Sequence, residues 1–241
     1  MRRWCGMEFA QYLAPGEFVD SGDPFVERFA GKVTLDANDD VSRARKLYYA
    51  VRDEILYDPY YGGEARRYFR ASDCLRAKRG FCIAKAALLA AAARCLGIPA
   101  RVAFADVRNH LSTKRLLELM GGDIFIWHSL TELYLEGRWV KATPAFNLSL
   151  CQRFGVHPLE FDGRHDSLFH EYDRAGRKHM EYVRDRGHYA DVPYQRILAD
   201  LRETYPRWMK LLSEEQGGTL ATESSEAEGP PMRREEIRTK S

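Results

Sequence analysis

The sequence predicts an α+β domain that contains one alanine-rich helix and an antiparallel hairpin. The stretch 79–99 predicts a helix that begins near Cys82 and is stopped by a glycine and a proline at its far end. Two runs rich in aromatic and β-branched residues, 124–135 and 138–143, are separated by a Glu-Gly turn and predict paired strands. A long helix followed by an antiparallel pair is typical of the α+β class.

Length and composition are those of an ordinary globular protein. The 241 residues are 45% hydrophobic and 12% aromatic, and the net charge of +2 gives no reason to expect nucleic acid or an anionic membrane as partner. No window approaches the about 18 apolar residues of a membrane span, and the N-terminus lacks the apolar run of an export signal. Five cysteines without a CxxC pair are typical of reduced thiols, which predicts a cytoplasmic protein.

Two further helices are expected before the alanine-rich one. Apolar residues at helical spacing over 41–56 predict a helix whose cap is Asp40 or Ser42. A polar, aromatic loop over 60–69 follows, and Ser72 then predicts the cap of a short helix. These segments lead the chain to the start of the alanine-rich helix.

After that helix the expected elements are less regular. The apolar stretch 100–107 predicts a strand, 110–122 a helix or loop, and 146–193 a polar, aromatic loop. A final helix is expected over about 192–212, with Pro206 as a kink. We therefore expect one domain over 1–212, with helical additions at both ends of its core, and a disordered tail over 213–241.

Cys82 is the first candidate for chemistry because it begins a helix. The free N–H groups and the positive dipole end at that position favour the thiolate, which is the nucleophilic form of cysteine. The alternative is a small core residue, which is our expectation for Cys95 at the far end of the same helix. Lys85, one turn after Cys82, either adds positive potential or lies solvated on the helix face.

His128 is the second candidate, on the first strand of the hairpin. Strand alternation predicts that it shares a face with Ile126 and Leu130, while Trp127 and Ser129 point the other way. A lone histidine on a strand is commonly a satisfied core residue. Together with a helix-terminal cysteine it predicts a Cys-His pair.

A metal site is the rival hypothesis for the segment 151–191. Histidines, aspartates and one cysteine gather there, but neither an HExxH spacing nor a CxxC pair is present, so we expect no metal. The residues considered are Cys151, His157, Asp162, His165, Asp166, His170 and His179. We expect this segment to cover a cleft near the cysteine, or to be a surface excursion.

Four short motifs occur in an order that resembles the transglutaminase-like superfamily in a bacterial-type, single-domain form. They are Gly80-Phe81-Cys82, the RCLGIPAR run at 94–101, Trp127-His128-Ser129, and the GRWVK run at 137–141. The resemblance covers about residues 41–146. It implies a papain-like core in which the helix that bears the nucleophilic cysteine packs on an antiparallel sheet.

The resemblance also implies covalent acyl transfer without a metal or organic cofactor. Cys82 would attack a carboxamide or peptide carbonyl, and His128 would hold it as thiolate in an ion pair and later protonate the leaving amine. The N–H of Cys82 would be one oxyanion donor. For the second donor, Tyr57, Tyr60 and Tyr61 stay open. No acidic loop supports calcium binding.

The third catalytic position departs from the family pattern. Members usually place an aspartate four residues after the strand tryptophan, where this chain has Thr143. A threonine hydroxyl can hold a neutral imidazole but cannot stabilise imidazolium by charge. Asn147, used as asparagine is in papain-like enzymes, and Asp106 on the neighbouring strand are the other candidates.

The function expected from these residues is thiol-dependent acyl transfer on a peptide or protein amide. The reaction is either hydrolysis, by a peptidase, amidase or deamidase, or transamidation to an amine. The alternative is a catalytically silent member that binds a peptide or protein. Thr143 supports this alternative, whereas the retained Cys82 and His128 oppose it. Oligomeric state stays open.

Overall fold

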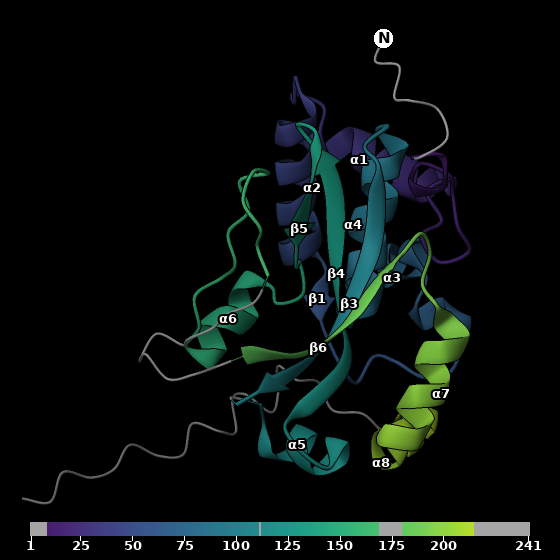
Figure 1. Ribbon diagram of the computed structural model, residues 1–241, viewed down its shortest axis with the longest axis vertical. Helices are drawn as coiled ribbons and strands as arrows, with labels where there is room; N and C mark the ends of the chain where they lie inside the picture. Colours follow the sequence, from purple (N-terminus) through teal and green to yellow (C-terminus); the bar gives the residue numbers. More distant parts are fainter. Residues whose placement is uncertain (1–8, 111, 169–179, 215–241) are drawn as a thin grey trace, which may run out of the picture.

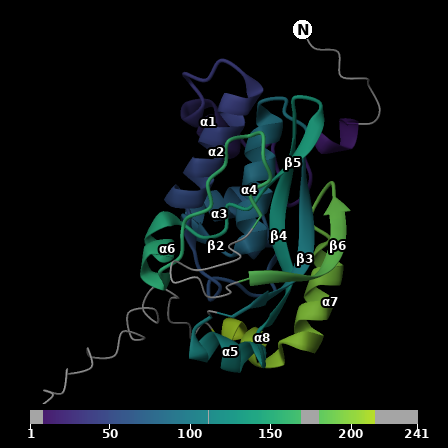
Figure 2. The ribbon, with the colours of Figure 1, turned by 60° about the vertical axis from the view of Figure 1, so that its left-hand side comes forward.

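A four-stranded antiparallel sheet, in the order β5-β4-β3-β6, forms one layer of the protein, and helices cover one of its faces (Figures 1 and 2). This computed structural model describes residues 9–110, 112–168 and 180–214. The strands are β3 (Ala100–Asn109), β4 (Ile124–Leu135), β5 (Arg138–Ala142) and β6 (Met180–Tyr189). The expected α+β class and the hairpin of β4 and β5 are confirmed.

The helices precede, interrupt and follow the sheet in the chain. Before it come α1 (Pro24–Val33), α2 (Asp40–Glu54), α3 (Ala71–Ala77) and α4 (Cys82–Cys95). Within and after it come α5 (Lys114–Met120), α6 (Leu148–Phe154), α7 (Tyr194–Thr204) and α8 (Pro206–Ser213). Short elements are the 3-10 helices η1 (Ala10–Tyr12) and η2 (Arg66–Tyr68) and the strands β1 (Leu56–Tyr57) and β2 (Arg79–Gly80).

The alanine-rich helix α4 lies at the centre of the core. Every residue from Ile83 to Arg94 is buried, because α1, α2 and α3 contact it on one side and β3 and β4 on the other. A helix enclosed in this way needs no polar face. Alanine side chains let the neighbouring elements approach closely, which explains the composition of this stretch.

The helix expected over 41–56 is confirmed as α2, but its cap differs from both candidates. The Asp39 carboxylate accepts a hydrogen bond from the Ser42 N–H, and the Ser42 hydroxyl accepts one from the Asp39 N–H. This reciprocal pair is a capping box with Asp39 at its start. The predicted cap at Ser72 was also wrong: α3 starts after Arg70, and the Ser72 N–H donates to Asp20.

The C-terminal part differs most from expectation. The single helix predicted over 192–212 is two helices, because Pro206 lacks an N–H and starts α8 instead of kinking α7. The predicted loop over 146–193 contains α6 and the edge strand β6. β6 escaped prediction because most of its side chains are polar and exposed, without the alternation that a half-buried strand shows.

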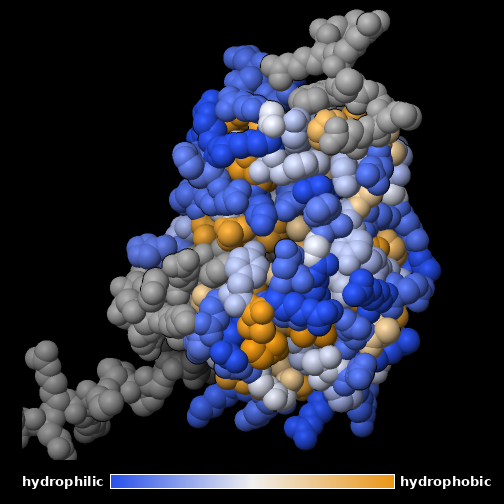
Figure 3. Space-filling view, viewed as in Figure 1, coloured by the Kyte–Doolittle hydropathy of each residue, from blue (hydrophilic) through white to orange (hydrophobic). Residues whose placement is uncertain are grey.

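The surface shown in Figure 3 is predominantly hydrophilic. Among the described residues the large hydrophobic side chains that are exposed are Leu35, Leu56, Leu148, Tyr182 and Val183. In the same part of the chain, no helix combines the length and the hydrophobicity needed to cross a bilayer. The domain bounds 1–212 stay a prediction, and most of the predicted tail, residues 215–241, lies outside the described residues.

Candidate active site

Cys82 is the first residue of α4, as predicted. The two short parallel strands hold the segment that precedes it. Phe81 is the extended residue before the helix. Tyr57 of β1 pairs with Gly80 of β2, so the segment that leads into Cys82 is tied to the end of α2. Any Cβ at Gly80 would lie 2.8 Å from the Cys74 sulfur, so this position requires glycine.

The Cys82 thiol faces strand β4. Backbone N–H groups of Ser129, Ile83 and Cys82 itself favour its thiolate form, but burial outweighs them and raises the pKa of Cys82 to about 11. The side chain is half-buried. At neutral pH the isolated site therefore holds a thiol, whose sulfur already faces the donors that would stabilise its anion.

His128 lies next to Ser129 on β4 and lines the same cavity as Cys82. It is 9% exposed, and burial lowers its pKa to about 4. Its Nε2 has no hydrogen-bond partner among the described residues. Burial therefore favours a neutral thiol and a neutral imidazole over the ion pair that the resemblance implies.

A β-bulge immediately before His128 breaks the expected strand alternation. Ala105 of β3 pairs with His128 and Val107 pairs with Phe125, so two residues of β4 lie opposite one of β3. Trp127, the second of those two, has a φ of 58°, a left-handed conformation that is strained for a large side chain. His128 is thus the first β4 residue after the bulge.

A charged network holds the bulge from three neighbouring elements. The Asp106 carboxylate of β3 accepts hydrogen bonds from the Trp127 N–H at 3.1 Å and from Arg186 Nε of β6 at 2.5 Å. Asp200 of α7 accepts from the Trp127 indole at 2.8 Å and from Arg186 Nη1 at 2.6 Å. The strained peptide thus has its N–H satisfied by a buried, paired carboxylate.

The junction between α7 and α8 bonds to the same strand. The Tyr205 hydroxyl donates to the Ile124 carbonyl at 2.8 Å and accepts from the Ile126 N–H at 2.7 Å. Ile126 is one of the two bulge residues without a register partner on β3, so the tyrosine hydroxyl supplies the acceptor for its N–H. The C-terminal helices therefore support the approach to His128.

Thr143 lies just after β5 and lines a second, smaller cavity together with His128. Its side chain is buried, and its hydroxyl has no hydrogen-bond partner among the described residues. The backbone N–H of Thr143 donates to the Ser167 carbonyl at 2.9 Å. Thr143 and His128 are thus brought to one cavity without being hydrogen bonded to each other.

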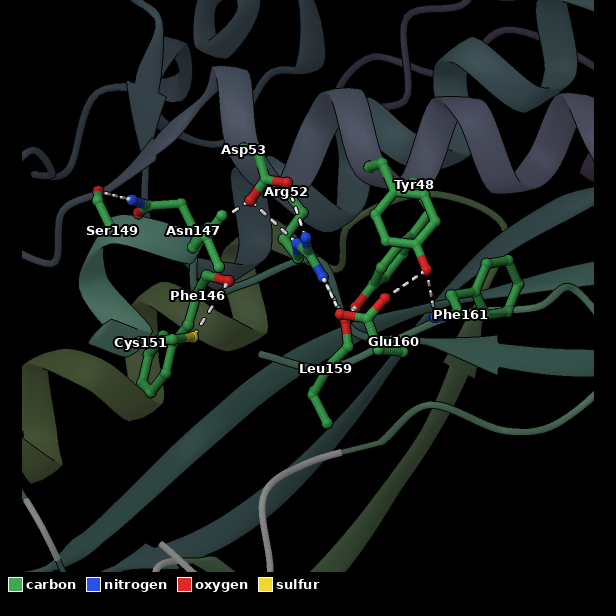
Figure 4. Close-up of polar contacts among 12 residues, drawn as sticks. Tyr48, Arg52, Asp53, Phe146, Asn147, Ser149, Cys151, Leu159, Glu160 and Phe161 are labelled. Carbon is green, nitrogen blue, oxygen red and sulfur yellow. Dashed lines mark hydrogen bonds and ion pairs between the residues drawn. The ribbon is translucent and has the colours of Figure 1, made fainter. Parts of the chain in front are cut away.

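Asn147 is engaged elsewhere. Its side-chain oxygen accepts from the Tyr57 N–H at 3.0 Å, and its nitrogen donates to the Ser149 hydroxyl at 2.7 Å. Figure 4 shows it beside Asp53, which accepts from the Leu148 N–H at 2.9 Å. Asn147 lines neither cavity at His128, so the structure joins it to Tyr57 and not to the imidazole.

Of the three candidate oxyanion tyrosines, Tyr57 alone lines the cavity with Cys82. Burial, together with the charge of a Cys82 thiolate, keeps the pKa of Tyr57 well above its usual value, so the hydroxyl retains its proton. The Tyr60 ring lies 5.3 Å from the Arg115 guanidinium, and the Tyr61 ring packs against Tyr68 and Arg79.

The structure contradicts the solvated position that was one of the two interpretations of Lys85. Lys85 is fully buried, and its Nζ donates to the carbonyls of Arg52 at 3.0 Å and Ile55 at 2.5 Å, where α2 ends. It satisfies backbone acceptors that the helix leaves free. Burial lowers the pKa of Lys85 to about 7.

No group of three potential metal ligands occurs within 9–110, 112–168 and 180–214. Of the residues considered for zinc, Cys151 is buried with its sulfur 3.9 Å from the Phe146 carbonyl, and His165 Nδ1 lies 2.6 Å from Asp162. His170 and His179 lie outside the described residues. The described cysteines, Cys74, Cys82, Cys95 and Cys151, are free thiols.

Sequence reasoning named Asp106 only as a candidate partner of the imidazole, whereas the structure places its carboxylate on the Trp127 N–H and Arg186. The other supports of His128 were missed. Arg186 and Asp200 carried no signal, since they lie on elements far along the chain whose pairing only the fold reveals. Tyr205 immediately precedes Pro206. The proline predicted a break in the helix, but nothing in the sequence predicted that the tyrosine bonds to β4.

Comparison with solved structures finds partial similarity to two proteins. A candidate cysteine protease from Cytophaga hutchinsonii is similar at a TM-score of 0.44 and 20% identity, over 57% of this chain and 42% of that one. A candidate protease from Parabacteroides distasonis is similar at a TM-score of 0.35 and 17% identity, over 49% of this chain and 22% of that one. No curated protein matches. The family model of the transglutaminase-like superfamily matches residues 27–144, and this stretch, which includes Cys82 and His128, is the transglutaminase-like part of the chain.

Proposed function

We propose that the protein catalyses thiol-dependent acyl transfer on a peptide or protein amide, with Cys82 as nucleophile and His128 as its base. The observation that carries the proposal is the placement of both side chains on one cavity, with the Cys82 sulfur against the N–H that follows His128. A cysteine at a helix start beside an imidazole is the arrangement that thiol acyl transfer needs.

The reaction starts from the neutral pair. As the sulfur of Cys82 attacks the amide carbonyl, the neutral imidazole of His128 takes the thiol proton. The imidazolium then gives that proton to the leaving amine, and the C–N bond breaks to leave a thioester on Cys82. Water or an amine takes the acyl group in a second attack, with the imidazole again as base, and the thiol is restored.

Two groups are positioned to stabilise the oxyanion. The Cys82 N–H lies at the start of α4, where no intrahelical acceptor is available to it. The Tyr57 hydroxyl keeps its proton next to Cys82 and is the second donor in our proposal. Asn147 then acts through Tyr57, since its amide fixes the tyrosine backbone.

Acylation by an activated ester tests the proposal, with Cys95 as an internal control. Cys95 belongs to the same helix, and burial raises its pKa to about 11 as well, but the side chains that act on its charge are the carboxylates Glu27 and Asp20. The rate of acylation is measured for each cysteine by mass spectrometry between pH 5 and 9, with p-nitrophenyl acetate.

We expect a plateau for Cys82 across this range, because the pKa of His128 is about 4 and that of Cys82 about 11. Acylation of Cys95 is expected to rise about tenfold per pH unit, as for a simple thiolate. In His128→Gln, Cys82 should lose its plateau and about 10²- to 10⁴-fold in rate at pH 7.

A silent binding module is the second candidate, and one observation favours it. His128 Nε2 has no hydrogen-bond partner in the described part of the chain, where the family usually has a carboxylate, and Thr143 supplies no charge there. An imidazolium at this position is unsupported. If Cys82 is acylated no faster than Cys95 and His128→Gln changes nothing, the catalytic proposal fails and binding is the function to pursue.

A further inference from the structure

The cavity beside Cys82 has a wall that the family match does not include. Part of it comes from chain segments after residue 144, where the matched region ends. The apolar and aromatic side chains of this C-terminal wall are Phe146, Phe154, Met180, Leu201, Tyr205 and Trp208. The space next to the nucleophile is therefore shaped by this chain's own additions to the family core.

The polar ends of this wall are already bonded. The Trp208 indole N–H donates to the Pro59 carbonyl at 3.2 Å. The Tyr205 hydroxyl is held by the backbone of β4 on both its donor and its acceptor side. Both residues thus contribute ring surface, and no free hydrogen-bonding group, to the cavity.

The rest of the described lining carries no aspartate, glutamate, lysine or arginine. Leu116 and Met120 of α5 and Phe125 of β4 extend the apolar surface, and Asn109 and Ser112 are uncharged. A charged group placed here would lose its hydration without meeting an opposite charge. An aromatic or branched aliphatic group would exchange water for ring and methyl contacts.

We propose that this cavity is the acyl-side specificity pocket, which takes an uncharged aromatic or branched aliphatic group attached near the scissile carbonyl. The inference rests on the proposed function of Cys82. The acyl group stays bonded to Cys82 after the amine has left, so the cavity that Cys82 lines holds this group through both steps. The wall residues are buried or half-buried in the core, so the pocket is formed before substrate binds.

A series of p-nitrophenyl esters tests the preference. The acyl groups are 3-phenylpropionyl, 4-methylpentanoyl, acetyl and succinyl, the last of which carries a carboxylate. Acylation rates of Cys82 at pH 7 are divided by those of Cys95, which removes the intrinsic reactivity of each ester. We expect ratios about 100-fold higher for the phenyl and branched acyl groups than for acetyl, with succinyl lowest. Equal ratios for all four esters would overturn the pocket while leaving Cys82 catalysis intact.

Met120→Lys provides a variant that moves the preference. Met120 is half-buried, so a lysine there can keep its ammonium near water while its charge faces the cavity. We expect the succinyl ester to gain at least about tenfold relative to the phenyl ester. Leu35→Lys is the matched control, because Leu35 is 89% exposed and outside the cavity, and its ratios should equal those of wild type. Unchanged ratios in Met120→Lys contradict the proposal.

A binding experiment with a variant that cannot react separates the proposed pocket from the proposed catalysis by Cys82. Cys82→Ala is titrated with 3-phenylpropionamide and with succinamic acid, and binding is followed by changes in the NMR signals of the tryptophan indole N–H groups. Binding of the phenyl amide alone supports the pocket even if wild-type Cys82 forms no thioester, which would defeat only the proposed function. Equal or absent binding of both compounds defeats the pocket.

Discussion

The two halves of the candidate site are built in opposite ways. The cysteine half is a regular helix start, where Cys82 follows one extended residue and α4 continues without interruption through the core. The histidine half is an interrupted strand, where a bulge and the left-handed Trp127 precede His128. Local sequence places the nucleophile, whereas contacts between distant elements place its base.

The two halves of the site also differ in how well each would stabilise a charged catalytic group. Three backbone N–H groups face the Cys82 sulfur, so a thiolate would find donors already in place. No described group is hydrogen bonded to Nε2 of His128, so an imidazolium would have no acceptor there. The histidine half therefore stabilises a charged side chain less well than the cysteine half. We expect substitutions around His128 to lower activity more than substitutions near the start of α4.

Asp106→Ala should give the largest effect. It removes the acceptor of the Trp127 N–H and leaves Arg186 with Asp200 alone. We expect Cys82 acylation to fall about 100-fold because the imidazole is misplaced, and unfolding free energy to fall by about 3–5 kcal/mol because a buried pair is broken. Acylation kinetics measure the loss of rate, and urea unfolding measures the loss of stability.

The control is another buried ion pair on the same two strands. Arg101 Nε of β3 lies 2.5 Å from Glu132 of β4, away from the bulge. Glu132→Ala should lower stability similarly while acylation of the folded protein stays near the wild-type rate. If both variants lose activity to the same extent, Asp106 has only a general stabilising effect. Asp106→Asn, which keeps an oxygen for the Trp127 N–H, should recover part of the rate.

The contrast also explains which parts of the molecule the sequence could predict. The alanine run, the glycine before Cys82 and the Glu-Gly turn act over a few residues, so α4 and the hairpin were predictable. Trp127 takes its left-handed conformation only because Asp106, Arg186 and Asp200 meet around it, and they are far apart in the chain. Periodicity cannot reveal such a meeting, so the alternation predicted along β4 does not hold across the bulge before His128.

Thr143→Asp tests whether the missing charge is what keeps the histidine neutral. A carboxylate on the cavity that Thr143 shares with His128 would favour imidazolium. We expect the pKa of His128 to rise by about 1–3 units from its value near 4, and the plateau rate of Cys82 acylation to rise about tenfold. NMR titration of the imidazole measures the first effect. Thr143→Asn supplies the shape without the charge, and an equal shift in that variant would rule out the electrostatic explanation.

Substitution of Lys85 tests the cysteine half of the site. We expect it to change the stability of the protein and the pH dependence of that stability. The pKa of Lys85 is about 7 in the fold, because burial outweighs the attraction of nearby Cys74, Asp53 and Cys151. In the unfolded chain a lysine titrates near its ordinary value of about 10.4, so between these values the unfolded state binds the extra proton. Stability should therefore rise with pH above 7, by about 1.4 kcal/mol per unit for this group.

Lys85→Met should remove that slope and, because two α2 carbonyls lose their donor, lower stability by about 1–3 kcal/mol at pH 9. Urea unfolding at pH 7, 8 and 9 measures both as the difference between wild type and Lys85→Met. The difference is needed because the pKa values of Cys74, Cys82 and Cys95 are raised in the fold, so ionisation of these thiols in the unfolded chain, near about 8.5, lowers the stability of both proteins as pH rises. Lys46→Met, which removes a surface lysine of α2, should keep the wild-type slope. An identical slope in wild type and Lys85→Met would mean that Lys85 stays charged in the fold, held by the carbonyl dipoles at the end of α2. The positive potential one turn from Cys82 would then be real, and the cysteine half would be better prepared for a thiolate than burial alone indicates.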